Sequence, residues 1–403
     1  LSPFYAEANR MLGAIPCPSI GQADHLLREV GKEIRGEDTF HINPVGVYFG
    51  EKGVTAPDPF FFFFFPERTG CEFCGACMIG CPNGAKNTLD KNYLYLAQKL
   101  GAVVFSETEV TSVRQISEGR YEVVAQSSHG MTRKTKTFNT NGVIFSGGVL
   151  GTVKLLLECK QKNLLPDISE CLGDFTRTNS EAILGIDSRD SSKDWNDHVA
   201  ITSGIYPDKD THIEIVRYNK GSDLLYSLAT VLTNGGGKIP RILRFFGNIL
   251  RHPYQFLRSL WVPGQSKRMS IILVMQSTEN YLTLKKTMIG LNSVLPSDGR
   301  RIPTYIPIAN QVTRLMAKKM NGYPKGSWFE VLMDAPTTAH ILGGCIMGKT
   351  ANEGVVDQQG RLFGYPGLYV ADGSVVPVNL NANPALTITA LAEYIMNGIP
   401  EKV

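Results

Sequence analysis

Hydrophobic residues recur at helical spacing along several parts of the chain. Residues 22–34 place four aliphatic side chains on one helical face, a spacing typical of an amphipathic helix packed on a core. Further helices are predicted at residues 1–12, 87–100, 224–232, 240–250 and 310–320, and from about residue 152. The last helix is predicted from its boundary residues, with Asn383 at the N-cap, Pro384 in the first turn and Gly398 after the end.

Other segments read as strands, in several of which apolar and polar residues alternate with a period of two. They are residues 102–105, 109–115, 121–125, 132–138, 199–205, 211–216, 269–276, 281–285 and 368–371. A buried strand over residues 142–145 leads into a glycine turn and then a helix. This order of elements predicts a mixed α/β fold, in which helices accompany a mixed or antiparallel sheet.

The length of the chain indicates more than one domain. With 403 residues it is longer than one ordinary core supports, so we expect two interleaved domains. Its 43% hydrophobic and 19% charged residues exclude a disordered chain. A net charge of +4 gives no reason to expect a nucleic-acid partner.

The sequence also carries information about the cellular compartment of the protein. It contains no run of eighteen apolar residues, and no signal peptide is visible after Leu1. Eight cysteines in this length do not form a disulfide scaffold, which favours a reducing compartment. We therefore expect a cytoplasmic protein, and the sequence leaves its oligomeric state open.

Six consecutive phenylalanines occupy residues 60–65. The run is far too short to cross a membrane. Apolar runs of this length usually belong to a core, which favours a buried wall. The alternative is a lip that faces lipid or substrate.

Four cysteines follow the spacing C-x2-C-x2-C-x3-C-P, which is that of bacterial ferredoxins. They are Cys71, Cys74, Cys77 and Cys81. In that pattern the fourth cysteine serves a second cluster, and this chain has no second run. A single cluster would need a distant ligand from the remaining cysteines. A structural loop or a zinc-like site is therefore favoured over an iron–sulfur electron-transfer module.

The segment from Ser146 to Gly151 combines a strand, a glycine turn and a helix start. This geometry places a phosphate or a flat cofactor at a helix N-terminus. Ser146 stands where a dinucleotide fingerprint needs its first glycine, so the segment fails as an independent NAD site. It is acceptable as a second glycine turn beside a cofactor bound mainly elsewhere.

Three polar residues are candidates for chemistry. His340 precedes a double glycine, so it is either a core histidine or an acid–base group near a ligand. Asn383 either caps its helix or faces a ligand. Glu214 lies within an apolar strand, so it is either paired with a cation such as Arg217 or a base with a raised pKa.

The stretch 238–268 contains seven basic residues and no acidic residue. Its basic residues are Lys238, Arg241, Arg244, Arg251, Arg258, Lys267 and Arg268, interleaved with aromatic and aliphatic side chains. One interpretation is a solvated basic face over a packed helix. The other is a peripheral membrane contact through which a lipid-like substrate enters.

Several of these motifs together resemble the glucose–methanol–choline (GMC) oxidoreductases. The C-terminal signature comprises residues 340–344, 354–357, 364–374 and 383–387. Residues 84–94, 177–181 and 210–214 resemble the cholesterol-oxidase branch more narrowly. The similarity runs along essentially the whole chain.

The resemblance implies an FAD-dependent oxidation of a secondary alcohol, with a sterol or other hydrophobic alcohol as substrate. It maps the catalytic histidine of the family to His340 and the catalytic asparagine to Asn383. The carboxylate that shifts the steroid double bond maps to Glu214. The flavin-binding positions that it implies are Val110, Gly147, Asp372, Gly373, Asn383 and Pro384.

The resemblance also implies a domain organisation. Residues 1–69 and 171–339 would form the substrate-binding domain, and residues 70–170 and 340–403 an FAD-binding, Rossmann-like domain. The G-x-G-x-x-G segment that opens such chains is absent here, so we expect an incomplete FAD-binding domain. The alternative to an enzyme is a non-catalytic or lipid-binding remnant. Ile341 also replaces the proline that often follows the histidine.

Overall fold

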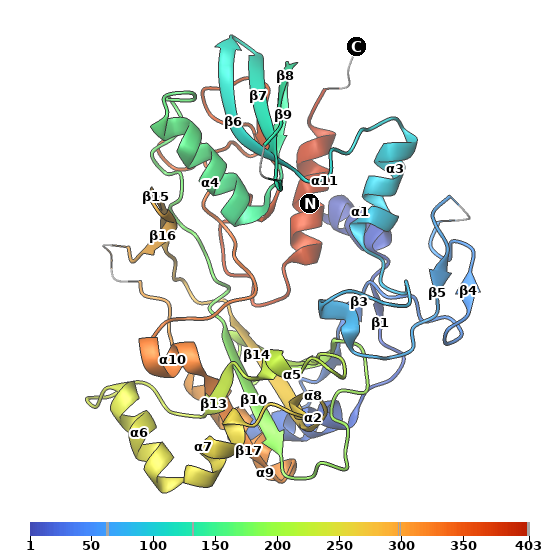
Figure 1. Cartoon of the computed structure of the whole chain (residues 1–403), viewed down its shortest axis with the longest axis vertical. Coiled ribbons are helices and arrows are strands. Elements are labelled where there is room, and N and C mark those ends of the chain that lie inside the picture. The colour runs from blue at the N-terminus through green and yellow to red at the C-terminus, as the bar shows by residue number, and fades with distance from the viewer. Residues whose placement is uncertain (62–63, 131–132, 297, 299, 401–403) are drawn as a thin grey trace.

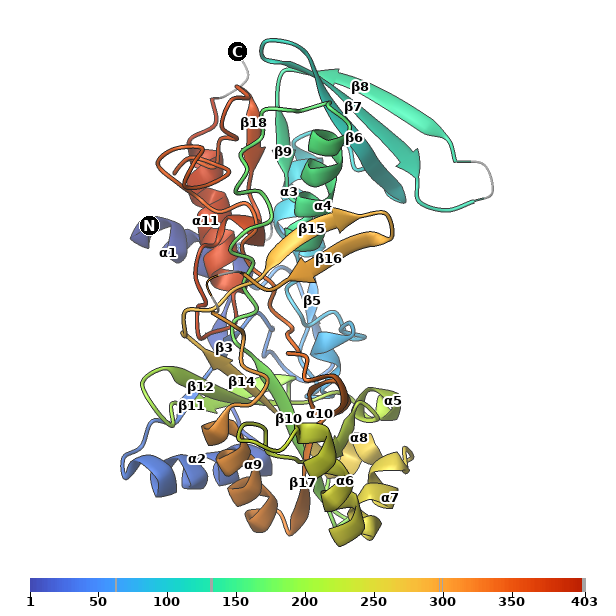
Figure 2. The same cartoon turned by 90° about the vertical axis from the view of Figure 1, so that its left-hand side faces the viewer.

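A seven-stranded antiparallel sheet forms one end of the elongated molecule (Figures 1 and 2). The computed structural model describes residues 1–61, 64–130, 133–296, 298 and 300–400. The strands lie in the order β13 (Ala229–Val231), β17 (Gly322–Ser327), β10 (Ala182–Ser188), β14 (Met269–Gln276), β12 (Thr211–Val216), β11 (Ile201–Ile205) and β2 (His41–Ile42).

Helices α2 (Gln22–Arg35) and α9 (Pro307–Lys319) cover one face of this sheet. Side chains alternate along a strand, and on β12 Ile213 and Ile215 pack into the core beneath these helices. Val216 and the residues that alternate with Ile213 and Ile215 along β12 therefore belong to the opposite face, where the cavity described below lies.

The other end of the molecule is built around a two-stranded parallel pair. Its strands are β9 (Val143–Phe145) and β18 (Leu368–Val370). A glycine turn connects β9 to α4 (Gly148–Gln161), and Gly148 has a φ of 69° there. Beside them lie an antiparallel sheet of β6 (Thr108–Ser117), β7 (Arg120–Ser127) and β8 (Thr135–Thr140), and the packed helices α1 (Ser2–Leu12) and α11 (Ala385–Asn397).

The remaining elements are short. The helices are α3 (Tyr93–Lys99), α5 (Asp223–Tyr226), α6 (Arg241–Arg251), α7 (Pro253–Leu260), α8 (Gln265–Arg268) and α10 (Trp328–Met333), with single 3-10 turns at Ala76–Met78, Leu89–Lys91 and Gly373–Val375. The strands are β1 (Ile15–Pro16), β3 (Pro44–Val45), β4 (Thr55–Ala56), β5 (Arg68–Thr69), β15 (Thr283–Thr287) and β16 (Gly290–Val294).

The strongest patterns predicted their elements well. The helix predicted at 22–34 is α2, and the strands predicted at 211–216 and 269–276 are β12 and β14 with the same bounds. The prediction of a strand at 102–105 is wrong, and the helix predicted at 224–232 ends at Tyr226 and gives way to β13. The pairing of β13 with β17 overrides the helical spacing there.

Two boundary predictions are also wrong. The last helix begins at Ala385 with Pro384 at its N-cap, so Asn383 is not the cap. The helix predicted at 87–100 shortens to α3, because the buried amides of Asn87 and Asn92 donate to the backbone oxygen of Met11 at 3.1 and 3.3 Å. These hydrogen bonds hold the preceding loop against α1.

The phenylalanine run is mostly inward-facing where it is described. Phe61 and Phe65 are buried and form a small core with Met11. Phe64 is exposed, and the predictions for residues 62 and 63 lie outside the described residues.

Candidate functional site

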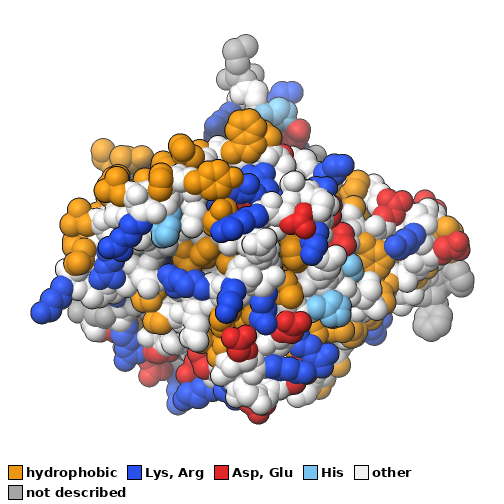
Figure 3. Space-filling view, turned by 90° about the horizontal axis from the view of Figure 1, so that it is seen from below, with side chains coloured by type: hydrophobic (Ala, Val, Ile, Leu, Met, Phe, Trp, Pro, Cys, Tyr) orange, Lys and Arg blue, Asp and Glu red, His pale blue; other side chains and the backbone are white. Residues whose placement is uncertain are grey.

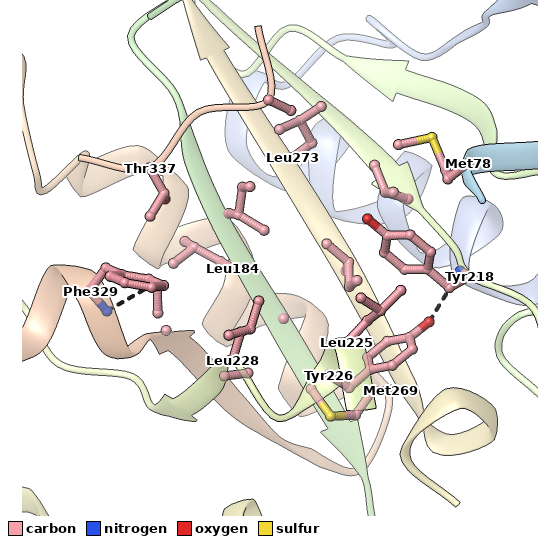
Figure 4. A pocket seen from close by; sticks show the side chains of 18 of the residues that line it. Met78, Leu184, Tyr218, Leu225, Tyr226, Leu228, Met269, Leu273, Phe329 and Thr337 are labelled. Atoms are coloured by element: carbon pink, nitrogen blue, oxygen red, sulfur yellow. Dashed lines mark hydrogen bonds between the residues drawn. The ribbon is translucent and has the colours of Figure 1, made fainter. Parts of the chain in front are cut away.

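An apolar cavity lies on the face of the seven-stranded sheet opposite α2 and α9. It contains about 1000 Å³ of space not filled by protein atoms, including space open to solvent. Figure 4 shows aliphatic and aromatic side chains converging on it, among them Leu184, Leu228, Met269, Leu273 and Phe329. A space of this kind suits a ligand that is large and mostly apolar.

Two of the predicted residues, His340 and Asn383, line this same cavity. His340 lies in the loop after α10, and Asn383 lies just before α11. Most of the aliphatic side chains come from the sheet, so these two groups supply polar character at one part of an apolar space. The structure therefore brings together the imidazole and carboxamide that the sequence pointed to.

A buried carboxylate orients His340. Nδ1 of His340 hydrogen-bonds to Oε1 of Glu181, whose side chain is inaccessible to solvent. The other oxygen of Glu181 accepts from the Thr338 hydroxyl at 2.9 Å and from the Ala339 backbone N–H at 2.6 Å. Because Nδ1 is used in this way, Nε2 is the nitrogen of His340 left for a ligand.

Glu214 is held by amides, and no Lys or Arg of the described residues forms a salt bridge with it. The Asn43 amide donates to Oε1 at 2.7 Å, and the Asn383 amide donates to Oε1 and Oε2 at 3.0 and 2.9 Å. Burial raises the pKa of Glu214 to about 7, although the Asn383 hydrogen bonds, the charge of His340 and the Asn43 hydrogen bond act in the opposite direction. The carboxyl group can therefore both hold and release a proton near neutral pH.

Arg217 does not form a salt bridge with Glu214. It forms a salt bridge with Asp24 of α2, and both side chains are fully buried. The prediction that Arg217 neutralises Glu214 is therefore wrong. The other prediction, a raised pKa of Glu214, agrees with its burial among amides.

The double glycine after His340 permits a close backbone approach. A Cβ on Gly343 would overlap the backbone oxygen of Phe175, and both Gly343 and Gly344 have positive φ values of 76° and 92°. The N–H of Gly343 donates to the oxygen of Gly373 at 3.0 Å. This bond joins the His340 loop to the segment predicted to contact a flavin.

A second groove lies at the other end of the molecule, between β6 and α4. Val110, Gly147 and Gly151 line it, within about 1560 Å³ of open space. A Cβ added to Gly151 would meet no atom within 4 Å, so this wall leaves room for a flat group to lie against the backbone. The groove therefore fits the cofactor predicted from the sequence.

Asp372 lies next to this groove. The Gly147 N–H donates to the Thr152 hydroxyl at 3.0 Å, and that hydroxyl donates to Oδ2 of Asp372 at 2.5 Å. Oδ1 of Asp372 accepts from the backbone N–H of Ser374 at 2.8 Å. The glycine turn and the 3-10 turn at Gly373–Val375 are thereby fixed to one another.

The cysteine loop contributes to a small core. Cys71, Cys77 and Cys81 pack there with Cys17, and all eight cysteines are free thiols. Across residues 1–61, 64–130, 133–296, 298 and 300–400, no group of three or more His, Cys, Asp or Glu side chains is placed to hold a metal ion. Burial raises the pKa of the Cys71 thiol to about 11.

The basic stretch is only partly a free basic surface. Arg258 and Arg268 pair with buried Asp187, and Arg241 pairs with buried Glu330. The remaining four cations, which form no salt bridge within the described chain, are Lys238, Arg244, Arg251 and Lys267. The acids that neutralise the other three lie far away in sequence, so the composition of the stretch could not reveal them.

Sequence reasoning missed two residues that contact the candidate site. Glu181 was noted only as part of a motif, and Asn43 was not noted. A signal was present in the strand register: Asn43 and His41 are two apart on one strand segment, as are Glu214 and His212 on another. Polar residues at alternate positions share one face of a sheet.

A histidine and an asparagine at an apolar cavity, with a glycine-lined groove nearby, fit a flavin-dependent alcohol oxidoreductase, and the comparisons with known proteins establish that class. The GMC oxidoreductase models match residues 66–173 and 306–392. The chain belongs to the GMC oxidoreductase family, and its cofactor is FAD.

The chain is similar to curated and solved members of this class. It is 42% identical to a cholesterol oxidase of Acinetobacter baumannii, over 99% of this chain and 74% of that one. It is 41% identical to a cholesterol oxidase of Mycobacterium tuberculosis, over 100% and 72% of the two chains. An FAD-dependent oxidoreductase from Chaetomium thermophilum has the same fold, with a TM-score of 0.51 and 13% identity over 94% and 72%.

The comparisons confirm the mixed α/β fold with an FAD-binding part and a substrate-binding part, and they confirm the predicted enzyme class. Within the described residues, no helix is both long enough and apolar enough to cross a membrane.

Proposed function

We propose that this protein oxidises the secondary hydroxyl of a sterol to a ketone. The observation that carries the proposal is an apolar cavity whose lining includes His340 and Asn383. Such a space accepts a rigid, mostly hydrocarbon molecule and offers it a few polar groups to orient its hydroxyl. The cholesterol oxidases among the relatives support a sterol as the substrate.

His340 acts as the acid–base group. Its Nε2 accepts the proton of the substrate hydroxyl, while Glu181 holds the ring through Nδ1 and stabilises the imidazolium that forms. Bound FAD would supply the acceptor for the hydride that leaves the carbinol carbon. Val110 and Gly147 in the groove, with Asp372, Gly373, Asn383 and Pro384 around the start of α11, are proposed to hold it.

Asn383 links the two chemical groups. Its amide donates to Glu214 and its side chain borders the cavity. Helix α11 begins two residues later, and the positive potential of a helix N-terminus stabilises negative charge placed there. We keep the domain boundaries predicted from the sequence at residues 69/70, 170/171 and 339/340, with two exceptions. Helix α1 packs against α11 and the β15–β16 hairpin packs against α4, so both belong with the FAD-binding part.

Glu214 is proposed to perform a second step, the isomerisation of a β,γ-unsaturated ketone to its conjugated form. The carboxylate removes a proton from the carbon next to the carbonyl and returns a proton to the far end of the double bond. A pKa of about 7 suits a group that must do both.

The oxidation is tested with His340→Gln in the FAD-loaded protein. Removing the acid–base group is expected to lower the turnover of a sterol by about 10² to 10⁴-fold, with flavin absorbance retained. His129→Gln is the matched control, because His129 is exposed at the far end of the molecule. Equal turnover in wild type and His340→Gln would contradict the proposal.

We also propose that α6 and α7 contact a lipid membrane from which the sterol enters. These helices expose Leu243, Phe246, Leu250 and Leu257, and Trp261 directly after α7 is exposed as well. Figure 3 shows hydrophobic side chains gathered on one side of this end of the molecule, with Lys and Arg between them.

The exposed apolar surface continues to the cavity. Leu225, Leu228 and Phe329 line the cavity and are 40%, 55% and 42% exposed. The unpaired cations Lys238 and Arg251 add attraction to anionic lipid, which is worth about 1 kcal/mol for each cation near a membrane surface.

Co-sedimentation with vesicles of phosphatidylcholine, with and without phosphatidylglycerol, tests this contact. Leu250→Glu is expected to weaken binding about tenfold or more, because it places a charge in the apolar contact. Leu100→Glu is the matched control. Leu100 directly follows α3 and is 90% exposed, which is similar to the 83% exposure of Leu250. Equal loss in the two variants, or no binding by the wild type, would contradict the contact.

A further inference from the structure

Two imidazoles connect the buried carboxyl group of Glu214 to the edge of the sheet. His212 precedes Glu214 by two residues on β12, and its Nδ1 lies 3.8 Å from Oε1 of Glu214. Its Nε2 lies 3.0 Å from Nε2 of His41 on the edge strand β2. His212 is 3% exposed and His41 is half-buried, so the contact runs from the interior toward solvent.

A glycine in the middle strand leaves room for the two imidazole rings to meet. Strand β11 lies between β2 and β12, and Gly204 pairs with His41 on one side and Glu214 on the other. A Cβ on Gly204 would overlap Nε2 of His212 and lie 3.1 Å from Nε2 of His41. Any larger residue at this position would separate the rings.

One backbone carbonyl determines the tautomers. Nδ1 of His41 lies 3.2 Å from the oxygen of Thr39, which can only accept, so Nδ1 carries the hydrogen. Nε2 of His41 is then an acceptor, and Nε2 of His212 donates to it. This leaves Nδ1 of His212 as an unprotonated nitrogen, buried and without a hydrogen-bond partner in the described structure, on the side nearest Glu214.

The other neighbours of Glu214 among the described residues act on it differently. Asn43 and Asn383 donate amide hydrogens to it, and His340 and Glu181 affect its pKa through their charges. When a sterol fills the cavity, water cannot reach Glu214 from that direction. Burial and the neighbouring His41 lower the pKa of His212 to about 3, although the backbone of Asn381 acts to raise it. His212 is therefore neutral at rest and able to accept a proton on Nδ1.

We propose that His212 and His41 form a proton relay between Glu214 and solvent, an inference that rests on the proposed role of Glu214. The Glu214 proton passes to Nδ1 of His212, while the Nε2 proton of His212 passes to Nε2 of His41. The Nδ1 proton of His41 leaves to water. Glu214 ends as a carboxylate, and both rings remain neutral with their tautomers exchanged. Inward transfer along the same path restores the starting state.

The 3.8 Å separation at the inner end does not block this path. Rotation of the Glu214 carboxyl shortens it, and contacts of catalytic groups are commonly long before substrate binds. The relay lets Glu214 return to its required protonation state between turnovers even with the cavity occupied.

Infrared spectroscopy tests the relay without flavin or turnover. The carboxylic-acid C=O band of Glu214, identified by its loss in Glu214→Gln at pH 5.5, shifts when its proton is replaced by deuterium. After rapid mixing with D₂O, with a non-reactive steroid ketone in the cavity, His41→Phe is expected to slow this shift about tenfold or more. The phenyl ring preserves the stack with Tyr206 and His212, whose ring centroids lie 5.0 and 4.9 Å from that of His41.

Tyr206→Phe is the matched control, because Tyr206 stacks on both imidazoles but supplies no ring nitrogen. It is expected to leave the exchange rate unchanged. Equal exchange rates in wild type, His41→Phe and His212→Phe would overturn the relay. So would the absence of a Glu214 acid band at pH 5.5, because Glu214 would then hold no proton to pass.

A second measurement separates this inference from the proposed function. A β,γ-unsaturated steroid ketone supplied directly in D₂O is isomerised without oxidation, and deuterium in the product is measured by mass spectrometry. The relay predicts deuterium in the wild-type product and about tenfold less in His41→Phe. A wild type that isomerises nothing contradicts the proposed isomerisation alone, since the infrared result still decides the relay.

Discussion

Two buried carboxylates touch the same sheet and differ in what neutralises them. Asp24 on α2 is fully buried, and it contacts the guanidinium of Arg217 and the hydroxyls of Thr202 and Ser203. Glu214 on β12 is 1% exposed, and it accepts hydrogen bonds only from amides. They lie on opposite sides of the sheet, one toward the helices and one toward the cavity.

The pKa values of the two groups move in opposite directions. Burial acts to raise the pKa of Asp24, but Arg217 and the hydroxyl and backbone donors around it lower it overall. Burial raises the pKa of Glu214 to about 7, because amide donors offset only part of the cost of burying charge. A buried carboxylate with a cation is a permanent ion that holds the fold, whereas one without a cation can carry a proton.

Removing the carboxyl group of Glu214 should have the largest effect on chemistry. Glu214→Gln keeps the size and polarity of the side chain but cannot take or return a proton. Isomerisation of a β,γ-unsaturated steroid ketone is therefore expected to fall by about 10² to 10⁴-fold. The measurement is the absorbance of the conjugated ketone. A variant that isomerises at the wild-type rate would show that another group carries the proton.

Removing the carboxylate of Asp24 should instead reduce stability. Asp24→Asn leaves the Arg217 guanidinium buried without its counterion, which typically costs about 3 to 5 kcal/mol. The free energy of unfolding, measured by urea denaturation, is expected to fall by that amount. Glu214→Gln is the control and should not lower it. Similar stabilities for Asp24→Asn and wild type would remove the distinction between the two carboxylates.

The pH dependence of stability sharpens the same comparison. The pKa of Glu214 is raised from 4.5 to about 7 by folding, so the folded state binds the extra proton between these values. Stability is then lost as pH rises from about 4.5 to 7, by up to about 3 kcal/mol at 1.36 kcal/mol for each pKa unit. Glu214→Gln should abolish this loss, making the variant more stable than wild type at pH 8 but not at pH 4.

Thermal unfolding of both proteins across pH 4–8 provides the measurement. The difference between them isolates Glu214, because the other titrating groups are shared. A difference that does not change with pH would show that Glu214 ionises in the fold as it does in water.

The sequence predicted the elements whose own residues follow a clear helical or strand pattern. β12 and β14 are aliphatic strands with clear bounds, and α2 has a complete apolar stripe. β10 and β17 were not predicted, because Gly185, Pro324 and Gly326 weaken the strand pattern. Pairing within the sheet determines these strands, and pairing is a long-range property.

The candidate site was predictable to a similar degree. Motifs identified His340, Asn383 and Glu214; the structure places His340 and Asn383 at the cavity and Glu214 in hydrogen-bond contact with Asn383. Glu181 and Asn43 reach the site from segments 159 and 171 residues away from their partners. Hydrogen bonds of that range have no local pattern in the sequence, so only the folded chain reveals them.

Glu181 extends the comparison to a third buried carboxylate, whose contacts include the imidazole of His340 as well as amide donors. Glu181→Gln preserves a hydrogen bond to Nδ1 but removes the negative charge that stabilises the imidazolium. Sterol oxidation is expected to fall about 10²-fold, with a larger effect on kcat than on KM. Thr338→Val is the control for the shape of the loop, since it removes a hydroxyl that donates to Glu181 at 2.9 Å and accepts from the His340 backbone N–H at 2.9 Å, but keeps the charge. An equal loss in both variants would mean that Glu181 merely shapes the loop, because only the charge distinguishes its proposed role from a structural one.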